Sequence, residues 1–114
     1  MLAGVIGVTL YAALDDGVRS LFQTGKGNNH QMPRFLDIHH HAQGMTRDQV
    51  AAAHARDVAV QGKYGVTFVR YWYDEATGKI FCLSDAPTRD AITAVHREAH
   101  GALADDIFEV IEGD

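Results

Sequence analysis

Apolar and polar residues follow two different periods along this chain. Between residues 33 and 41 they alternate, which places Leu36 and Ile38 on one side of a predicted strand and Asp37 and His39 on the other. Three further segments are rich in β-branched and aromatic residues and are also predicted to be strands. These segments are residues 66–74, 79–83 and 106–112, with a hairpin turn at residues 75–78.

Two segments with helical spacing are near-copies of each other. Residues 46–54 and 88–96 both open with Thr-Arg-Asp, and both end with a histidine four residues after a β-branched apolar residue. The threonine is suited to cap a helix, and the aspartate is favourable in the first turn. The predicted helices run from these threonines to about Gln61 and His100, and each buries the face that carries its histidine.

The order of elements, β-α-β-β-α-β, is the split βαβ order of ferredoxin-like folds. We therefore predict an α+β domain in which a four-stranded antiparallel sheet carries both helices on one face. We expect the helices to lie side by side and roughly parallel, so that His54 and His96 come level. The other face stays open, and Phe35 with the aromatic second strand makes it apolar, which favours a homodimer.

The composition indicates one soluble globular domain. The chain has 114 residues, 46% hydrophobic and 22% charged, enough to bury a core without disulfides. Ten basic and fifteen acidic residues give a net charge of −5, which argues against nucleic acid or an anionic membrane as partner. The single cysteine, Cys82, excludes an internal disulfide and makes the cytoplasm the default compartment; we interpret it as a small buried hydrophobic residue.

Residues 1–31 differ from the rest of the chain. Residues 2–14 form an uncharged apolar run about half as long as a membrane span requires. Residues 17–31 are polar and glycine-rich, as in a linker, and Met32 directly precedes the first convincing strand. We therefore expect an N-terminal extension, or a start assigned too far upstream, followed by one domain over residues 32–114.

Histidine is the residue type in excess, with seven in the chain. His96 and His100 lie one helical turn apart, a spacing that supplies half of a transition-metal site. His54 and Asp57 are three residues apart on the first helix, so the carboxylate can fix the tautomer of the imidazole. Such ligands suit nickel, copper or zinc. The plainer alternative is that these are polar residues satisfied at helix boundaries.

The position of His39 has two interpretations. Because it lies opposite Leu36 and Ile38, it either belongs to a separate site at a dimer interface or lies over a helix N-terminus where the strand end curls. The neighbouring His40 and His41 form a polar strand end or a short run that chelates metal adventitiously. The sequence leaves these alternatives open.

Five blocks of sequence carry a family resemblance; they are residues 32–39, 53–57, 70–72, 78–87 and 95–101. Together the blocks resemble a bacterial family of small ferredoxin-like proteins, long catalogued as a domain of unknown function, whose best-understood members bind nickel. The resemblance implies a homodimer that holds Ni²⁺ in histidine-rich sites for storage, buffering or sensing. Zn²⁺ and Cu²⁺ are the alternative ions. The expected metal ligands are His39, His54, Asp57, His96 and His100.

Two other functions compete with metal binding. Ferredoxin-like dimers also include small monooxygenases and isomerases, in which His39 beside Asp37 and Trp72 would act as general base in a sheet-face pocket. The other alternative is a dimeric interaction module with incidental histidines. The concentration of histidines on helices favours the metal-binding protein, and the sequence carries no nucleophile elbow, phosphate loop or CxxC pair.

Overall fold

Strands and helices form where the apolar pattern predicts them. The computed structural model describes residues 32–114, so the extension predicted at residues 1–31 lies outside the described residues. In chain order the elements are β1 (Arg34–His39), α2 (Arg47–Gln61), the 3-10 helix η3 (Gly62–Tyr64), β2 (Thr67–Asp74), β3 (Lys79–Asp85), α3 (Arg89–Ala99) and β4 (Asp106–Val110). This is the predicted β-α-β-β-α-β order.

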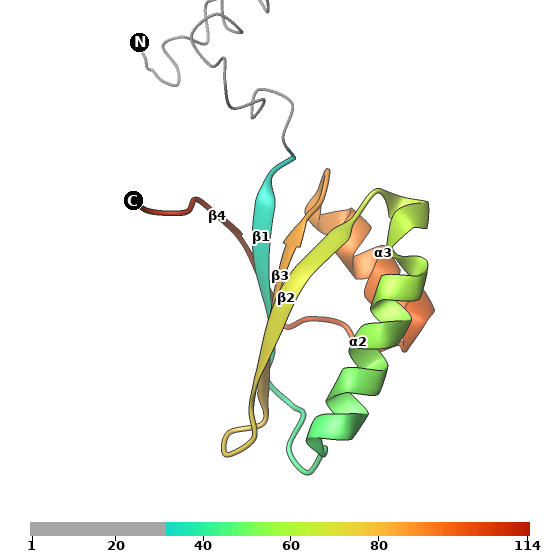
Figure 1. Cartoon of the computed structure of the whole chain (residues 1–114), viewed down its shortest axis with the longest axis vertical. Helices are drawn as coiled ribbons and strands as arrows, with labels where there is room; N and C mark the ends of the chain where they lie inside the picture. The colour runs from blue at the N-terminus through green and yellow to red at the C-terminus, as the bar shows by residue number, and fades with distance from the viewer. Residues whose placement is uncertain (1–31) are drawn as a thin grey trace, which may run out of the picture. The chain divides into compact units, whose positions relative to one another are not determined.

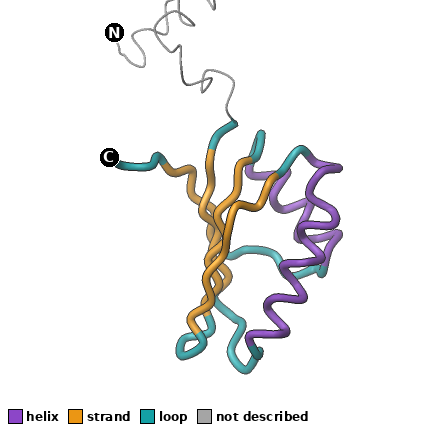
Figure 2. The backbone as a smooth tube through the Cα atoms, in the orientation of Figure 1, coloured by secondary structure: helices purple, strands orange, loops and turns teal. Residues whose placement is uncertain are grey.

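The strands form one antiparallel sheet in the order β2-β3-β1-β4. Leu36 of β1 pairs with Leu83 of β3 on one side and with Phe108 of β4 on the other, so β1 lies inside the sheet. Both helices lie on one side of the sheet (Figure 1). Figure 2 shows the same two layers, strands in one and helices in the other. The predicted ferredoxin-like α+β fold is confirmed.

The two Thr-Arg-Asp segments begin both helices, as predicted. Thr46 Oγ1 accepts a hydrogen bond from the Gln49 backbone N–H at 3.1 Å, and the Gln49 side chain accepts one from the Thr46 N–H at 2.9 Å. Thr88 Oγ1 accepts one from the Ala91 N–H at 3.1 Å. Gly101, with φ of 84°, ends α3 at the predicted place. These local bonds fix which residues of each helix face the sheet.

The helices run in opposite directions, which corrects the prediction that they are parallel (Figure 1). β1 and β3 are antiparallel neighbours, and each is followed by a helix that returns along the sheet, so α2 and α3 are antiparallel as well. Equal distances from the capping threonines therefore do not bring His54 and His96 level. Asp57 of α2 lies beside His96 instead.

A tight contact fixes the loop between β1 and α2 against the β2–β3 hairpin. Gly78, in the predicted turn, has φ of 75°, and a Cβ atom there would lie 2.6 Å from the backbone nitrogen of Gln43. The Gly78 carbonyl accepts a hydrogen bond from the Ala42 N–H at 2.9 Å. The Tyr73 hydroxyl shares its proton between the carbonyl oxygens of Ala42 and Met45, at 3.0 and 2.8 Å.

The core lies between the sheet and the helices. Phe35 is 2% exposed and belongs to this core, so the prediction that it lines the open face is wrong. Burial alternates along β1: Phe35, Asp37 and His39 face the helices, whereas Leu36 and Ile38 face the other side. The further core residues are Val66, Phe68, Cys82, Ala86, Ile92 and Val95.

The face of the sheet away from the helices is apolar, as predicted, although other residues than Phe35 make it so. Trp72 and Phe108 expose 49% and 50% of their surfaces there. The strand registers place the apolar residues Leu36, Ile38, Trp72, Phe81, Leu83, Phe108 and Val110 on this open face, together with Arg34 and Arg70. Among residues 32–114, no helix has the length and apolar character that crossing a membrane requires.

Candidate metal centre

His96 lies at the centre of the buried polar side chains. It is completely buried, between two carboxylates. His96 Nδ1 lies 3.0 Å from Asp57 Oδ1, and His96 Nε2 lies 3.2 Å from Asp37 Oδ2. An imidazolium donates from both nitrogens at once, whereas a neutral imidazole donates from only one. The geometry therefore favours a positive charge on His96.

Two further histidines extend this arrangement. His39 Nε2 lies 3.2 Å from Asp37 Oδ1, and His100 Nε2 lies 3.0 Å from Asp57 Oδ1. The ring centroids of His39 and His100 lie 4.8 and 5.3 Å from that of His96. Imidazoles and carboxylates thus alternate through a set that we call the His–Asp cluster: His39, Asp37, His96, Asp57 and His100.

Local structure positions each member of this cluster. Asp37 and His39 are two residues apart on β1 and point to the same face. His96 and His100 lie one turn apart on α3, and His100 occupies the C-cap position. The backbone N–H of Ala102 donates to His100 Nδ1 at 3.0 Å, so Nδ1 accepts this bond and Nε2 faces the cluster.

The cluster is charged although it is buried. Burial lowers the pKa of His96, but the hydrogen bonds and charges of Asp37 and Asp57 outweigh this effect and raise it to about 9. Burial raises the pKa of both carboxyl groups, and the neighbouring histidines outweigh it, so the pKa of Asp37 is lowered and that of Asp57 falls to about 2. At neutral pH we expect an imidazolium between two carboxylates.

The donor atoms fit a divalent transition metal. Potential ligand atoms form two groups, and within each group the atoms lie within 4.8 Å of one another. The groups are Asp37, His39, Cys82 and His96, and Asp57, His96 and His100. Asp37 Oδ1 is buried, and among residues 32–114 no donor is well directed at it, although His39 Nε2 is 3.2 Å away. A cation would satisfy this acceptor. Imidazole, carboxylate and thiolate are ligand types that bind nickel, copper and zinc.

Cys82 is buried, as predicted, but it also belongs to one of the two donor groups. Burial, and then the negative charges of Asp37 and Asp57, raise the pKa of the Cys82 thiol, so it is protonated in the metal-free protein. The ligand set predicted from the sequence left out Asp37 and Cys82, and it treated Cys82 as a buried hydrophobic residue. The signal for Asp37 was the strand alternation, which places it on the same face as His39.

His54 lies outside both donor groups. Its ring packs against Tyr71, with 4.5 Å between centroids, and burial lowers its pKa. Asp57, the partner predicted for His54, pairs instead with His96 and His100. The structure thus brings together four of the five predicted ligands, and the role of His54 stays a prediction.

His39 lies under the helices, which overturns both interpretations of its position. It is 9% exposed and shares the covered face with Phe35 and Asp37, so it neither faces a dimer interface nor curls over a helix N-terminus. The alternative enzyme required His39 in a pocket on the open face. Such a pocket would lack its general base.

His40 and His41 lie outside the cluster, at the end of β1. His40 Nε2 lies 2.7 Å from Asp106 Oδ2, and His41 Nε2 lies 3.9 Å from Asp105 Oδ1. The side chain of His41 is 81% exposed. These two histidines form the polar strand end that was one of the alternatives for this segment.

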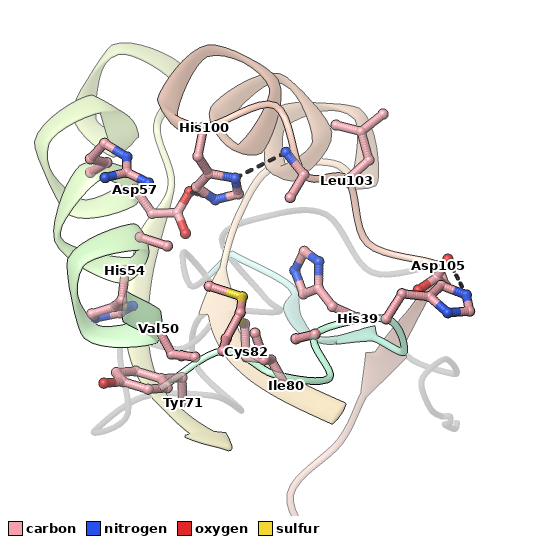
Figure 3. A pocket seen from close by; sticks show the side chains of 16 residues that line it. His39, Val50, His54, Asp57, Tyr71, Ile80, Cys82, His100, Leu103 and Asp105 are labelled. Carbon is pink, nitrogen blue, oxygen red and sulfur yellow. Dashed lines mark hydrogen bonds and ion pairs between the residues drawn. The ribbon is translucent and has the colours of Figure 1, made fainter. Parts of the chain in front are cut away.

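A cavity of about 330 Å³ adjoins the cluster (Figure 3). His39, Asp57 and His100 line it. The lining also includes His41 and Leu103, which are exposed, so the cavity opens to solvent. An ion can therefore reach the cluster from this side.

The sequence matches the family model described as "Nickel responsive protein SCO4226-like" over residues 35–110. The chain belongs to the SCO4226-like family. A solved structure, described as the crystal structure of SCO4226 from Streptomyces coelicolor A3(2), is similar to this SCO4226-like chain, with 41% sequence identity and a TM-score of 0.67. The similarity covers 71% of this chain and 99% of that chain.

No curated protein matches the chain. The resemblance inferred from the sequence is confirmed at the level of the family. All residues of the His–Asp cluster fall inside the matched range, 35–110, so the SCO4226-like part of the chain contains the whole candidate centre.

Proposed function

We propose that this protein binds a divalent transition metal ion, nickel in the cell, in the His–Asp cluster, and that it serves nickel storage, buffering or sensing rather than catalysis. The observation that carries the proposal is the convergence of donor atoms from β1, α2, β3 and α3 into two groups that share His96, with the atoms of each group within 4.8 Å of one another. Buried ionisable groups destabilise a fold unless they are paired or coordinate a metal. A metal-binding role accounts for their place in the core.

The proposed ligands are the imidazoles of His39, His96 and His100, which belong to two donor groups that share His96. A metal-bound histidine presents one nitrogen to the ion and commonly has its orientation fixed by a neighbouring carboxylate. Each of these rings lies 3.0–3.2 Å from a carboxylate oxygen of Asp37 or Asp57. These carboxylates would orient the rings or bind the ion themselves.

His54 is a further proposed ligand, since it lines the cavity through which an ion would enter. A histidine in this position needs a free nitrogen lone pair. Burial lowers the pKa of His54, so its ring is neutral at neutral pH and one nitrogen is available.

The family description supports nickel over zinc and copper. Imidazole and carboxylate ligands bind all three ions, and copper binds most tightly to a given set, so the ligand types alone do not choose. The matched family is described as nickel responsive, and we extend that property to this chain.

The test is a titration of metal-free protein with Ni²⁺, Zn²⁺ and Cu²⁺, followed by thermal unfolding. Binding to the native state alone raises the free energy of unfolding by about 2.7 kcal/mol at a free metal concentration 100 times the Kd. The informative variant is His39→Ala/His100→Ala, which removes two cluster imidazoles. Its matched control is His40→Ala/His41→Ala, which removes two imidazoles from the neighbouring strand end.

We expect nickel to stabilise the wild type and the control pair, and to have little effect on the cluster pair. A single His54→Ala variant then reports whether that ring contributes. Equal stabilisation of both double variants would place the metal elsewhere. Absence of any stabilisation by the three ions would overturn the proposed function.

We further propose a homodimer in the cytoplasm, joined through the open faces of two sheets. This proposal is supported by the apolar residues of that face, of which Trp72 and Phe108 are about half exposed. Contiguous apolar surface on a soluble protein marks an interaction site. A second copy is the simplest partner because a two-fold axis lets the same surface serve both subunits.

A further inference from the structure

The cavity beside the His–Asp cluster is larger than a metal ion needs. A water molecule occupies roughly 30 Å³ of liquid volume, so an ion that kept three waters would fill about 100 Å³. The cavity measures about 330 Å³. Pockets that bind small organic molecules begin at roughly 300 Å³. The space therefore has room for an organic molecule next to the ion.

Part of the cavity wall is apolar. Val50 of α2, Tyr71 of β2 and Ile80 of β3 line it on the side away from Asp57 and His100, and Leu103 lines it as well (Figure 3). Val50 is 2% exposed, and Tyr71 and Ile80 pack against the core, so this wall adjoins the core. An ion with its water shell gains nothing from such a wall, whereas the hydrocarbon part of an organic ligand is stabilised by it.

The polar part of the wall suits a carboxylate and a nitrogen donor. Arg56 lines the cavity, and none of the ion pairs formed within residues 32–114 involves it. Guanidinium groups bind carboxylates well. His54 also lines the cavity, and its buried Nδ1 has no hydrogen-bond partner in the described part of the chain.

We propose that the cavity binds a small monoanionic chelator, of about the size of an amino acid, together with the metal. Its nitrogen and one carboxylate oxygen would occupy coordination positions that the protein leaves free. Its hydrocarbon part would pack against Val50, Tyr71 and Ile80, with Arg56 near its negative charge. The inference rests on the proposed function, because the chelator is held through the metal, and it identifies the cargo as a metal chelate rather than a bare ion.

The probe is picolinate, pyridine-2-carboxylate, and its control is nicotinate, pyridine-3-carboxylate. Both have the same atoms, charge and shape, but only picolinate places nitrogen and carboxylate so that both bind one ion. Each is titrated calorimetrically into nickel-loaded and metal-free protein, and elemental analysis after dialysis measures the nickel retained. We expect picolinate to bind nickel-loaded protein at least about tenfold more tightly than nicotinate, with nickel retained.

Two tryptophan variants on α2 test the place of binding. Ala53 lines the cavity, whereas its neighbour Ala52 is exposed and does not. Ala53→Trp should fill the space and lower picolinate affinity at least about tenfold without changing nickel affinity, whereas Ala52→Trp should leave both unchanged. If Ala53→Trp does not fold, the comparison of picolinate with nicotinate on wild-type protein decides alone.

The outcomes separate this inference from the proposed function. Nickel binding with equal affinity for picolinate and nicotinate overturns the chelator and leaves the metal centre intact. Loss of nickel to picolinate in solution, without a ternary complex, also overturns it. Failure of the protein to bind nickel at all overturns the proposed function and the chelator together.

Discussion

On the face of the sheet that the helices cover, β1 presents Asp37 and His39, whereas on the open face the same strand presents Leu36 and Ile38. Charge is therefore buried and apolar surface is exposed, which reverses the usual distribution in a soluble monomer. The covered face holds an imidazolium between two carboxylates, while Trp72 on the open face is 49% exposed. The proposed function gives each face something the isolated chain does not contain: a metal ion inside and a second copy of the chain outside.

The largest expected effect on stability comes from His96→Leu, which removes the central histidine of the covered face. This substitution leaves Asp37 and Asp57 buried without their cation. We expect the free energy of unfolding of the metal-free protein to fall by roughly 3–5 kcal/mol at neutral pH, measured by urea denaturation. The matched control is His54→Leu, with no carboxylate partner, which should change stability by about 1 kcal/mol or less. A similar small effect for His96→Leu would contradict the charged cluster.

The pH dependence of stability tests the same face without mutation. The pKa of His96 is raised from 6.5 to about 9, so its contribution is fully present below pH 6.5 and is lost as pH rises through 9. At about 1.4 kcal/mol per unit, the metal-free protein should lose roughly 3 kcal/mol over this window, by urea denaturation at several pH values. His96→Leu should lack this loss.

The carboxylates respond in the opposite direction. The pKa of Asp57 is lowered from 3.8 to about 2, so its contribution is present above pH 3.8 and is lost as pH falls through 2. The covered face should therefore be most stable between these alkaline and acid limits. A stability profile that is flat from pH 6.5 to 9 would contradict the ion pairs.

The open face is tested by adding charge to it. Trp72→Arg/Phe108→Asp should convert a dimer of two 12.5 kDa chains into monomers, measured by light scattering after size exclusion. We expect the dimer dissociation constant to rise at least about 100-fold, because charges would be buried in an apolar contact. Val58→Asp is the control, since Val58 is also exposed, 43%, but lies on α2. A monomeric wild type would refute the homodimer.

The smallest expected effect comes from Ser84, and it tests whether the metal site includes residues beyond the His–Asp cluster. Ser84 is completely buried on the covered face of β3, and its Oγ has no hydrogen-bond partner among residues 32–114. Ser84→Ala removes an unsatisfied hydroxyl, so we expect stability to stay equal or to rise by about 1 kcal/mol, measured by thermal unfolding. A loss of metal affinity in this variant would show that the site extends onto β3, which contributes no residue to the His–Asp cluster.

Local signals explain why most of the fold was predictable from the sequence. The capping threonines Thr46 and Thr88 act through hydrogen bonds to residues only three positions away, and Gly78 marks its turn by a conformation other residues rarely adopt. The spacing of His96 and His100 is likewise local, and it correctly placed both rings together.

Which side of β1 the helices cover was not predictable from local signals. Alternation separates the two sides of a strand but does not say which side the helices cover, and Leu36 with Ile38 form the more apolar pair. The expectation that apolar residues face inward therefore placed Asp37 and His39 outside. The pairing of Asp57 with His96 also depends on the relative direction of α2 and α3, which the sheet register sets from far away in the sequence.

Because both ring nitrogens of His96 lie against carboxylates in a fully buried position, their protons exchange slowly with water. Protons held in this way give NMR resonances that stand apart from those of the backbone amides. The metal-free protein should therefore show two such signals from one histidine. Metal binding at either nitrogen must remove one of these two signals. The number of signals therefore measures whether the site holds a metal, without a label.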